Sequence, residues 1–333
     1  MTKLGFWQKL KKPILVLAPM ANVTDAAFRF IIAKYGKPQV MWTEFVSCDG
    51  LCSSGRENLL TDFWFTPKEK PIVAQIFGSR PENFYKTALL CQEMGFDGID
   101  INMGCPDRSV EKQGGGAALI KNPQLAQQII VETKRGAGPL PVSVKTRIGY
   151  NTNILDTWLY ALLEAQPAAI TIHGRTRKEM SLVPAHWDEI GRAGEIARKY
   201  DLSSERTLIL GNGDVMTLAQ AREKVEQYGI DGVMIGRGIF GNPWLFGDSG
   251  GPDSIEEKLK VMLEHTFLYH DIFEGRKNFA TMKKHYRAYV NGFDGAKELR
   301  AQLMETNTPE QVREIILAKY PKIKFKPLRA AKY

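Results

Sequence analysis

Cys105 stands in a short run that can carry proton-transfer chemistry, Asn102-Met103-Gly104-Cys105-Pro106. A thiol with a pKa of about 8.5 stays mostly protonated at neutral pH, so it can act as a general acid. A role as nucleophile is one alternative, but no histidine that could activate the thiol lies in the same segment. The other alternative is a cysteine that only packs within a turn and has no chemical role. We therefore expect Cys105 to be catalytic and to donate a proton.

Other small or polar residues also follow short apolar runs of the chain. They are Ala18, Pro19, Met20, Gln75, Asn102, Lys145, His173, Asn212, Gly213, Asp214, Gly236 and Arg237. A lysine in an apolar run needs an anionic or electron-rich partner, and a flavin ring is one such partner. Gln75 offers a donor and an acceptor to the pyrimidine edge of that ring, while Asn212 and Asp214 suit ribityl hydroxyls. The glycines beside Asn212 and Arg237 suit a phosphate.

Two other motifs do not support a site. The spacing Gly236-x-Gly238-x-x-Gly241 formally matches a dinucleotide fingerprint, but it follows the last apolar run and no strand comes after it. Cys48 and Cys52 lie four residues apart, and no second Cys or His pair stands nearby to complete a zinc site. We therefore expect no metal.

Eight apolar runs, each followed by a stretch of helical periodicity, must position these residues. The runs are Ile14–Met20, Val40–Phe45, Pro71–Phe77, Gly98–Met103, Pro141–Ile148, Ala168–His173, Thr207–Asn212 and Gly232–Arg237. Continuous Val- and Ile-rich runs that alternate with helices are typical of parallel strands buried on both faces. The pattern predicts a (β/α)8 TIM barrel, whose site lies at the carboxyl ends of the strands. A doubly wound open sheet is the alternative.

After Trp244 the alternation stops, and only helical periodicity follows residue 254. The predicted helices are Ile255–Tyr269, Asn278–Val290, Ala296–Glu305 and Pro309–Lys319. We expect a catalytic barrel at 1–246, a linker at 247–254, and a small C-terminal all-α helical bundle domain at 255–333. That last segment holds 16 Lys and Arg against 10 Asp and Glu, although the whole chain has a net charge of only +8. A charge gathered at one end favours a polyanionic partner over a small substrate, and a ligand-free basic surface is the alternative.

The chain has no apolar run of the roughly 20 residues needed to cross a bilayer. Lysines precede Ile14–Leu17 as in a short signal peptide, but Pro13 and Pro19 bracket only five residues, so a buried first strand is the better interpretation. The sequence therefore predicts a cytoplasmic protein. Nothing in it indicates an obligate dimer, and we expect a monomer.

The motifs together resemble the tRNA-dihydrouridine synthase family. The matching stretches are Ala18-Pro19-Met20, Ala74-Gln75, Asp100–Pro106, Val144–Arg147, His173–Arg177, Asn212–Asp214 and Gly236–Trp244, in the family's order. The resemblance implies reduction of the uridine C5–C6 double bond in tRNA by FMN, with NADPH as the electron donor. It implies that Cys105 protonates C5, that Asn102 and Arg177 contact uracil, and that the other strand-end residues named above bind FMN. It further implies that the basic tail grips tRNA.

Two features depart from the family's pattern. Ser181–Trp187 lacks the aromatic residue, Gly and Asp that often precede the tryptophan, and Gly114-Gly115-Gly116 gives the loop after Cys105 an unusual freedom to move. In the tail, Lys283, Lys284 and Arg287 cluster on one helix with His285, which we expect at the surface, and Lys322, Lys324, Lys326 and Arg329 suit a flexible electrostatic arm. Two alternatives remain: an FMN reductase of a free pyrimidine, similar to dihydroorotate dehydrogenase, and a non-catalytic RNA-binding protein on a barrel scaffold.

Overall fold

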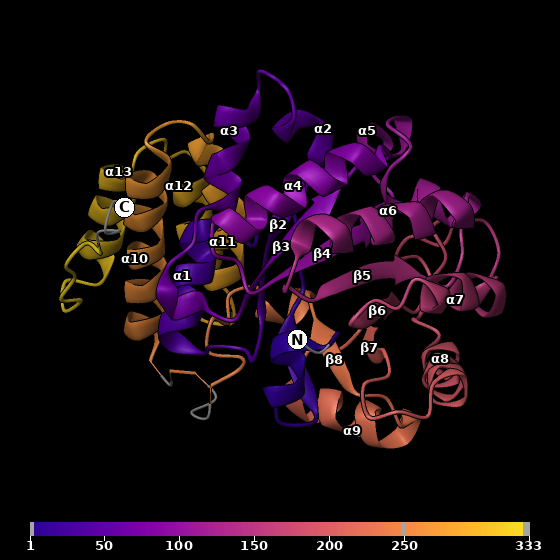
Figure 1. The fold of residues 1–333 in the computed structure, drawn as a ribbon. Coiled ribbons are helices and arrows are strands. Elements are labelled where there is room, and N and C mark those ends of the chain that lie inside the picture. Colours follow the sequence, from indigo (N-terminus) through magenta and orange to yellow (C-terminus); the bar gives the residue numbers. More distant parts are fainter. Residues whose placement is uncertain (1–2, 248–250, 253, 329–333) are drawn as a thin grey trace. The chain divides into compact units, whose positions relative to one another are not determined.

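Eight parallel strands form a single sheet, in the order β1-β8-β7-β6-β5-β4-β3-β2 (Figure 1). The structure, a computed structural model, describes residues 3–247, 251–252 and 254–328. The strands are β1 Ile14–Leu17, β2 Met41–Ser47, β3 Ile72–Phe77, β4 Gly98–Met103, β5 Val142–Arg147, β6 Ala169–His173, β7 Leu208–Asn212 and β8 Gly232–Ile235. Each predicted apolar run contains one of them or overlaps it closely. Almost every strand residue is buried, as expected for strands covered on both faces.

The two ends of the sheet meet, so it closes into a barrel. The backbone N–H of Leu17 donates to the carbonyl of Val40 at 3.5 Å, and that of Gln39 donates to Leu15 at 3.3 Å. The Gln39 side chain closes the seam further, because its Oε1 accepts from the Leu15 N–H at 2.6 Å. The predicted (β/α)8 TIM barrel is confirmed, and the alternative of an open, doubly wound sheet is wrong.

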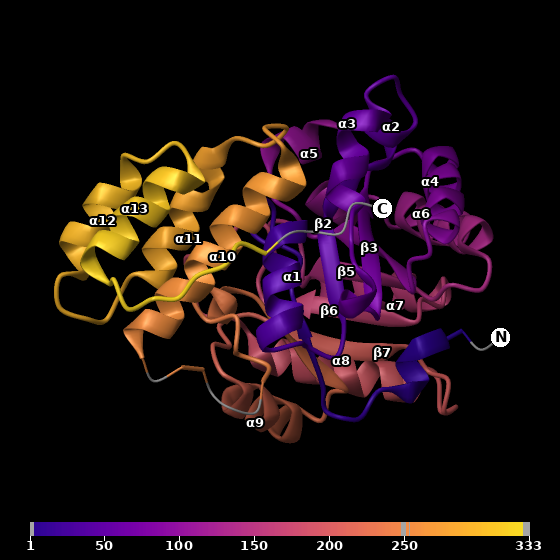
Figure 2. The ribbon, with the colours of Figure 1, turned by 90° about the vertical axis from the view of Figure 1, so that its left-hand side faces the viewer.

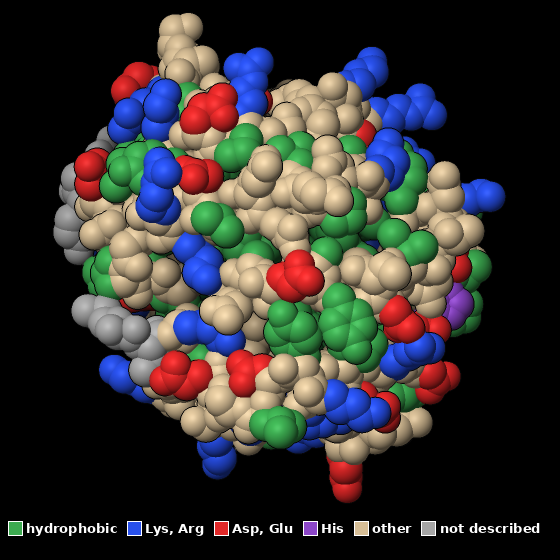
Figure 3. All heavy atoms as spheres, turned by 45° about the vertical axis from the view of Figure 1, so that its right-hand side comes forward, with side chains coloured by type: hydrophobic (Ala, Val, Ile, Leu, Met, Phe, Trp, Pro, Cys, Tyr) green, Lys and Arg blue, Asp and Glu red, His purple; other side chains and the backbone are tan. Residues whose placement is uncertain are grey.

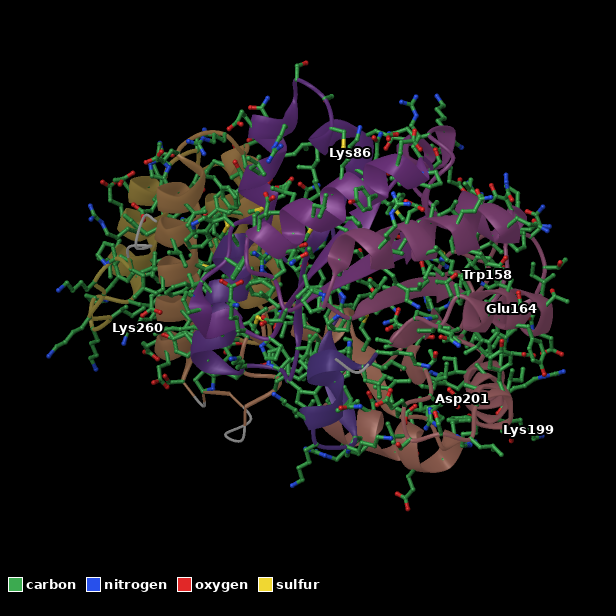
Figure 4. All side chains as sticks on the ribbon, viewed as in Figure 1. Lys86, Trp158, Glu164, Lys199, Asp201 and Lys260 are labelled. Carbon is green, nitrogen blue, oxygen red and sulfur yellow. The ribbon has the colours of Figure 1, made fainter. Side chains whose placement is uncertain are left out.

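Helices follow most strands of the barrel. The longer ones are α4 Pro81–Glu93, α6 Pro123–Ala137, α7 Leu155–Glu164, α8 Trp187–Tyr200 and α9 Leu218–Tyr228, and α2 Cys48–Leu51, α3 Arg56–Leu60 and α5 Arg108–Lys112 are short. Local sequence sets their starts: the Thr217 side chain and Gln220 form a capping box at the start of α9. Trp158, labelled on α7 in Figure 4, is buried and its indole N–H donates to Thr146 Oγ1 on β5 at 3.0 Å. This contact fixes the helix on its strand.

The chain forms two compact units that do not follow a single cut in the sequence. Residues 1–21, 39–63 and 70–237 form the barrel unit, and residues 22–38, 64–69 and 238–333 form the helical unit. The helices of the second unit are α1 Ala26–Tyr35, α10 Ile255–Phe273, α11 Met282–Tyr289, α12 Ala296–Met304 and α13 Pro309–Lys319, and the last four lie side by side in Figure 2. Three of the predicted C-terminal helices match closely, and the fourth begins as a 3-10 turn at Phe279–Thr281. Part of the predicted linker, residues 248–250 and 253, lies outside the described residues.

A buried ion pair holds the early segments of the helical unit together. The Arg29 guanidinium on α1 and the Glu69 carboxylate are both fully buried, with Nε and Oε2 2.8 Å apart. Arg29 also donates to the carbonyls of Thr24 and Trp64, and Glu69 Oε1 accepts from the Thr66 backbone and hydroxyl. Because each charge is fully hydrogen-bonded, burial of the pair is tolerated, whereas removal of one partner would leave a bare buried charge.

The surface carries charges of both signs. On the face in Figure 3, Lys and Arg side chains lie among Asp and Glu side chains rather than in one field. Among the described residues, no helix combines the length and the apolar character needed to cross a membrane.

Candidate active site

Ten of the eleven residues predicted to bind the cofactor line a single open cavity at the carboxyl ends of the strands, about 240 Å³ in volume. They are Ala18, Pro19, Met20, Lys145, His173, Asn212, Gly213, Asp214, Gly236 and Arg237. Arg175, Ser181, Val215, Met216 and Met234 also line it, and sequence reasoning did not place them there. Arg175 could have been found, since it stands two residues beyond His173 in the same cationic cluster. The described residues contain no group of three or more side chains suited to a metal ion.

Lys145 on β5 brings a cation to the cavity wall. Its Nζ donates to Asn212 Oδ1 at 3.2 Å, and the Asn212 Nδ2 in turn donates to the Met234 carbonyl at 2.8 Å, which fixes the direction of the amide. Burial lowers the pKa of Lys145 to about 8, and the nearby charge of Arg147 acts in the same direction. The ammonium group is therefore poised to gain stability from an electron-rich ligand.

A charged cluster also lines the cavity. Asp214 accepts from Arg175 through one carboxylate oxygen and from Arg237 Nη2 through the other, the latter at 2.7 Å. Burial of Asp214 acts to raise its pKa, but the hydrogen bonds from Arg175 and the Ala185 N–H, together with the charges of Arg175 and Arg237, hold that pKa below its usual value. Burial and the surrounding cations lower the pKa of His173 to about 2, so its ring is neutral. Arg175 Nη1 lies 3.1 Å from His173 Nε2, which is the acceptor because a guanidinium can only donate.

Gly213 is required by the shape of this wall. Its φ is +131°, and a Cβ there would lie 2.6 Å from the Cβ of Ala185 and 3.3 Å from the His173 ring. Asp214, the next residue, also has a positive φ of 53°. This tight turn after β7 brings the Asp214 carboxylate within hydrogen-bonding distance of Arg237, which follows β8.

Gln75 is the predicted cofactor residue that does not line the cavity. It is fully buried on β3, where its Nε2 donates to Asp100 Oδ2 at 2.7 Å and its Oε1 accepts from Asn102 Nδ2 at 3.3 Å. Its role toward a cofactor stays a prediction.

Cys105 lies in a turn whose backbone is held on both sides. The Asn102 Oδ1 accepts from the N–H groups of Gly104 at 3.1 Å and Cys105 at 2.9 Å. The carbonyl of Gly104 accepts from Arg147 Nε at 2.7 Å, and the carbonyl of Cys105 accepts from Ala117 N at 2.9 Å. The thiol is half-buried, and burial raises its pKa. It therefore stays protonated at neutral pH, as a general acid requires.

The glycine run after Cys105 serves close packing. A Cβ on Gly115 would lie 2.9 Å from the Gly78 carbonyl oxygen, and one on Gly116, whose φ is +58°, would lie 2.7 Å from the Cys105 carbonyl oxygen. Backbone atoms beside Gly115 and Gly116 leave no space for a side chain at either position, and these two glycines let the loop lie directly against the Cys105 turn. The freedom of movement expected of this loop stays a prediction.

The two predicted substrate residues, Asn102 and Arg177, are not among the residues that line the cavity. Asn102 is buried, and Arg177 has a side chain 28% exposed. Arg177 pairs with Glu111 of the loop after β4, and its guanidinium stands 5.4 Å from the ring centre of Tyr150. Glu111 and Tyr150 were not identified from the sequence.

The helical unit contains one residue whose predicted position is wrong. His285 on α11 is fully buried rather than at the surface, because α11 packs it against Phe28 and His265, with ring centres 4.8 and 4.6 Å away. Its neighbours Lys283 and Lys284 are half-buried and Arg287 is exposed, so the cations of this helix remain accessible.

The basic tail is anchored. Ile323 is buried and Phe325 contacts Phe267 of α10 with ring centres 5.2 Å apart. The alternating lysines are all exposed: Lys322, Lys324 and Lys326. This period-2 alternation makes the segment an ordered strip of charge, whereas the sequence alone suggested a flexible arm. Arg329 lies outside the described residues.

Comparison with known proteins identifies relatives along nearly the whole chain. Residues 16–324 match the family model described as Dihydrouridine synthase (Dus). The chain is 41% identical over 316 residues to a probable tRNA-dihydrouridine synthase 2 of Bacillus subtilis, covering 94% of this chain and 95% of the relative. It is 40% identical over 317 residues to a probable tRNA-dihydrouridine synthase of Staphylococcus aureus, with the same coverage of both chains.

Solved structures share the fold at low sequence identity. A 2-naphthoyl-CoA reductase in complex with 2-naphthoyl-CoA has a TM-score of 0.56 and 10% identity, covering 95% of this chain and 68% of that one. Histamine dehydrogenase from Rhizobium sp. 4-9 has a TM-score of 0.50 and 12% identity, covering 76% and 48%. At this identity the likeness concerns the fold alone.

Proposed function

This chain belongs to the dihydrouridine synthase family, and we propose that it reduces uridines in tRNA to 5,6-dihydrouridine with flavin mononucleotide (FMN) as cofactor and Cys105 as proton donor. The observation that carries the proposal is the convergence of ten strand-end residues on one cavity, with the Cys105 turn bonded to Asn102, the register partner of the cavity residue Lys145. The curated relatives named as probable tRNA-dihydrouridine synthases support it.

The residues of the cavity fit FMN. Lys145 offers a cation to the edge of the flavin ring that becomes negative on reduction. Asn212 and Asp214 offer acceptors to the ribityl hydroxyls, and the exposed Arg237 beside Gly236 offers a cation to the phosphate. A Cβ on Gly236 would meet Met20 only at 3.6 Å and Ala18 only at 3.7 Å, so these two residues leave room for the phosphate to approach Gly236. NADPH is our proposed electron donor.

The chemistry needs a hydride and a proton on adjacent atoms of uracil. FMN, when bound, supplies the hydride that adds to C6. Negative charge would then develop on C5 and on the oxygen of the neighbouring C4 carbonyl, and the Cys105 thiol delivers its proton to C5. Its raised pKa keeps that proton in place until then. We assign Asn102 and Arg177 to contacts with the base, and Asn102 also fixes the turn that carries the thiol.

The target uridine must leave its stack to reach the site, which costs least in a loop whose bases are already unstacked. We propose that residues 255–333 bind tRNA, since the segment carries most of the net charge and exposes Arg287 and the lysine strip 322–326. Both tRNA and NADPH are available in the cytoplasm, where we place the protein as a monomer.

The test compares three proteins on tRNA isolated from cells that lack this enzyme. The purified wild type is expected to be yellow and to form dihydrouridine with NADPH. Cys105→Ala should keep the flavin spectrum but lose turnover by about 10²- to 10⁴-fold, the usual share of a general acid. Cys52→Ala, which removes an exposed thiol elsewhere in the barrel unit, is the matched control and should be fully active. A colourless wild type, or full activity of Cys105→Ala, would overturn the proposal.

A further inference from the structure

A chain of side-chain hydrogen bonds leads from the barrel interior to the Cys105 turn. Asp100 Oδ1 accepts from Ser143 Oγ at 2.6 Å and its Oδ2 accepts from Gln75 Nε2 at 2.7 Å. Gln75 Oε1 accepts from Asn102 Nδ2 at 3.3 Å, and Asn102 Oδ1 accepts from the backbone of the turn. We call Asp100, Gln75 and Asn102 the amide relay.

The register of the sheet brings the relay together. Gln75 of β3 is the partner of Asp100 of β4, and Asp100 is the partner of Ser143 of β5. Asn102 stands two residues after Asp100, so it points to the same side of the sheet. Asp100 and Gln75 are fully buried, and Asn102 is 5% exposed, so water does not compete freely for these groups.

The direction of every hydrogen bond follows from Asp100. Burial raises the pKa of Asp100 to about 6, and hydrogen bonds from Gln75 and Ser143 oppose the rise, so the carboxylate is mostly ionised above neutral pH. An ionised carboxylate only accepts. Gln75 must therefore turn its NH₂ toward Asp100 and its oxygen toward Asn102. Asn102 must then turn its NH₂ toward Gln75, which leaves its oxygen for the two N–H groups of the turn.

We propose that Asp100 is a positioning residue for Cys105: as the acceptor at the base of the amide relay, it sets the orientation of the Gln75 and Asn102 amides and thereby holds the Gly104–Cys105 turn. With the relay reversed, the NH₂ of Asn102 would face two other donors, and the turn would lose its acceptor. The value of this arrangement for catalysis rests on the proton-donor role proposed above for Cys105. The relay itself is tested without turnover.

The test measures backbone hydrogen exchange at Gly104 and Cys105 by NMR in the full-length protein, together with the rate of Cys105 alkylation by iodoacetamide. Asp100→Leu removes the acceptor and should speed exchange at both amides by about fivefold, the factor for roughly 1 kcal/mol of lost hydrogen bonding. The amide of Ile170 in β6 serves as the internal reference, and exchange there should stay unchanged. Alkylation of Cys105 should also accelerate.

Two further variants distinguish orientation from general damage to the core. Asp100→Asn keeps an acceptor toward Gln75 and turns its NH₂ toward Ser143 Oγ, so exchange at the turn should stay within about twofold of wild type. The Asp100→Leu/Asn102→Asp double variant places an acceptor-only side chain at position 102. That side chain can accept hydrogen bonds both from the Gln75 NH₂ and from the N–H groups of the turn. It should restore the slow exchange that Asp100→Leu loses. A merely structural role for Asp100 predicts no such rescue.

The proposal is overturned if the amides of Gly104 and Cys105 exchange at the wild-type rate in Asp100→Leu, or if the double variant does not restore slow exchange. Should Asp100→Leu fail to fold, Gln75→Met breaks the relay at its middle link and must raise the same two exchange rates; wild-type rates in that variant overturn the proposal equally. Amide exchange and alkylation need neither FMN nor tRNA. Both can therefore be measured and interpreted even if the proposed function proves wrong.

Discussion

Arg177 and Glu111 form a bidentate ion pair that joins the loop after β6 to α5, the short helix that follows Cys105. The Arg177 Nε lies 3.0 and 3.1 Å from the two carboxylate oxygens of Glu111, and Nη2 also donates to Oε2. The Glu111 side chain is only 10% exposed. This pair thus holds the segment that follows Cys105, and Arg147 joins the residue before Cys105 to the loop after β6 through the Gly104 and Thr176 carbonyls.

Loss of the Arg177–Glu111 ion pair should loosen the loop that follows Cys105. We expect Glu111→Ala to speed alkylation of Cys105 by about fivefold, the factor for an ion pair worth roughly 1 kcal/mol. Mass spectrometry of the modified peptide gives the rate. Glu57→Ala, on the exposed side of α3, is the matched control and should react like wild type. An unchanged rate in Glu111→Ala would contradict a role for this ion pair in holding the loop.

Arg237 should contribute to FMN affinity through the phosphate. A charge-assisted hydrogen bond is worth about 1.5–3 kcal/mol, so Arg237→Ala should raise the dissociation constant for FMN by roughly 10- to 100-fold. Quenching of flavin fluorescence during titration of the apoprotein measures it. Arg222→Ala, an exposed arginine on α9, controls for net charge. Equal weakening by both variants would mean that only the overall charge matters, and riboflavin, which lacks the phosphate, should bind wild type and Arg237→Ala alike.

The lysine strip should contribute to tRNA binding as phosphate contacts. A plot of the logarithm of the tRNA binding constant against that of the salt concentration should become shallower by roughly 2–3 when Lys322, Lys324 and Lys326 are all changed to Ala. Filter binding at several salt concentrations measures the slope. The exposed lysines Lys68, Lys112 and Lys178 provide a triple control on other elements. An unchanged slope in the strip variant would remove these residues from the tRNA interface.

The helical unit should lose stability on acidification because of two buried histidines. His265 and His285 are fully buried, and their ring nitrogens have no hydrogen-bond partner among the described residues. Burial lowers the pKa of His285 to about 3 and that of His265 well below its usual value. A depressed folded-state pKa means that the unfolded chain binds the proton first. The stabilisation is therefore fully present above about pH 6.5 and is lost as the pH falls below it.

At pH 5 each histidine should cost about 2 kcal/mol of unfolding free energy relative to pH 7. His285→Phe removes one of them, so its stability should fall less steeply with pH than that of the wild type when measured by urea unfolding. His270→Phe, at an exposed position of α10, is the control and should follow the wild-type curve. A wild-type pH dependence in His285→Phe would contradict the argument.

Much of the site follows from local sequence. The run Gly98–Met103 was predicted as a strand with the same bounds that β4 has, because its apolar continuity and flanking turn residues are local features. In a closed parallel barrel every strand points the same way, so residues at the ends of the runs must meet at one rim. This is why ten residues chosen from the sequence line one cavity.

The errors concern side chains whose surroundings depend on distant segments. His285 lies between Lys284 and Tyr286 on a short, strongly charged helix, which favours the surface. Only packing against His265 of α10 and Phe28 of α1 puts its ring inside. The space at Gly115 is likewise set by a distant segment, because the backbone of Gly78, 37 residues away in the sequence, leaves no room for a Cβ.

The sequence by itself therefore determined the strands, their direction and the residues at their ends, since hydrophobic periodicity and turn chemistry act over a few residues. The tertiary structure alone decided which polar groups form ion pairs and hydrogen bonds with one another. Glu111 meets Arg177 across 66 residues, and Asp100 receives Gln75 and Ser143 from two neighbouring strands. Such pairings depend on sheet register, side-chain direction and the exclusion of water from the interior, and these exist only once the barrel has closed.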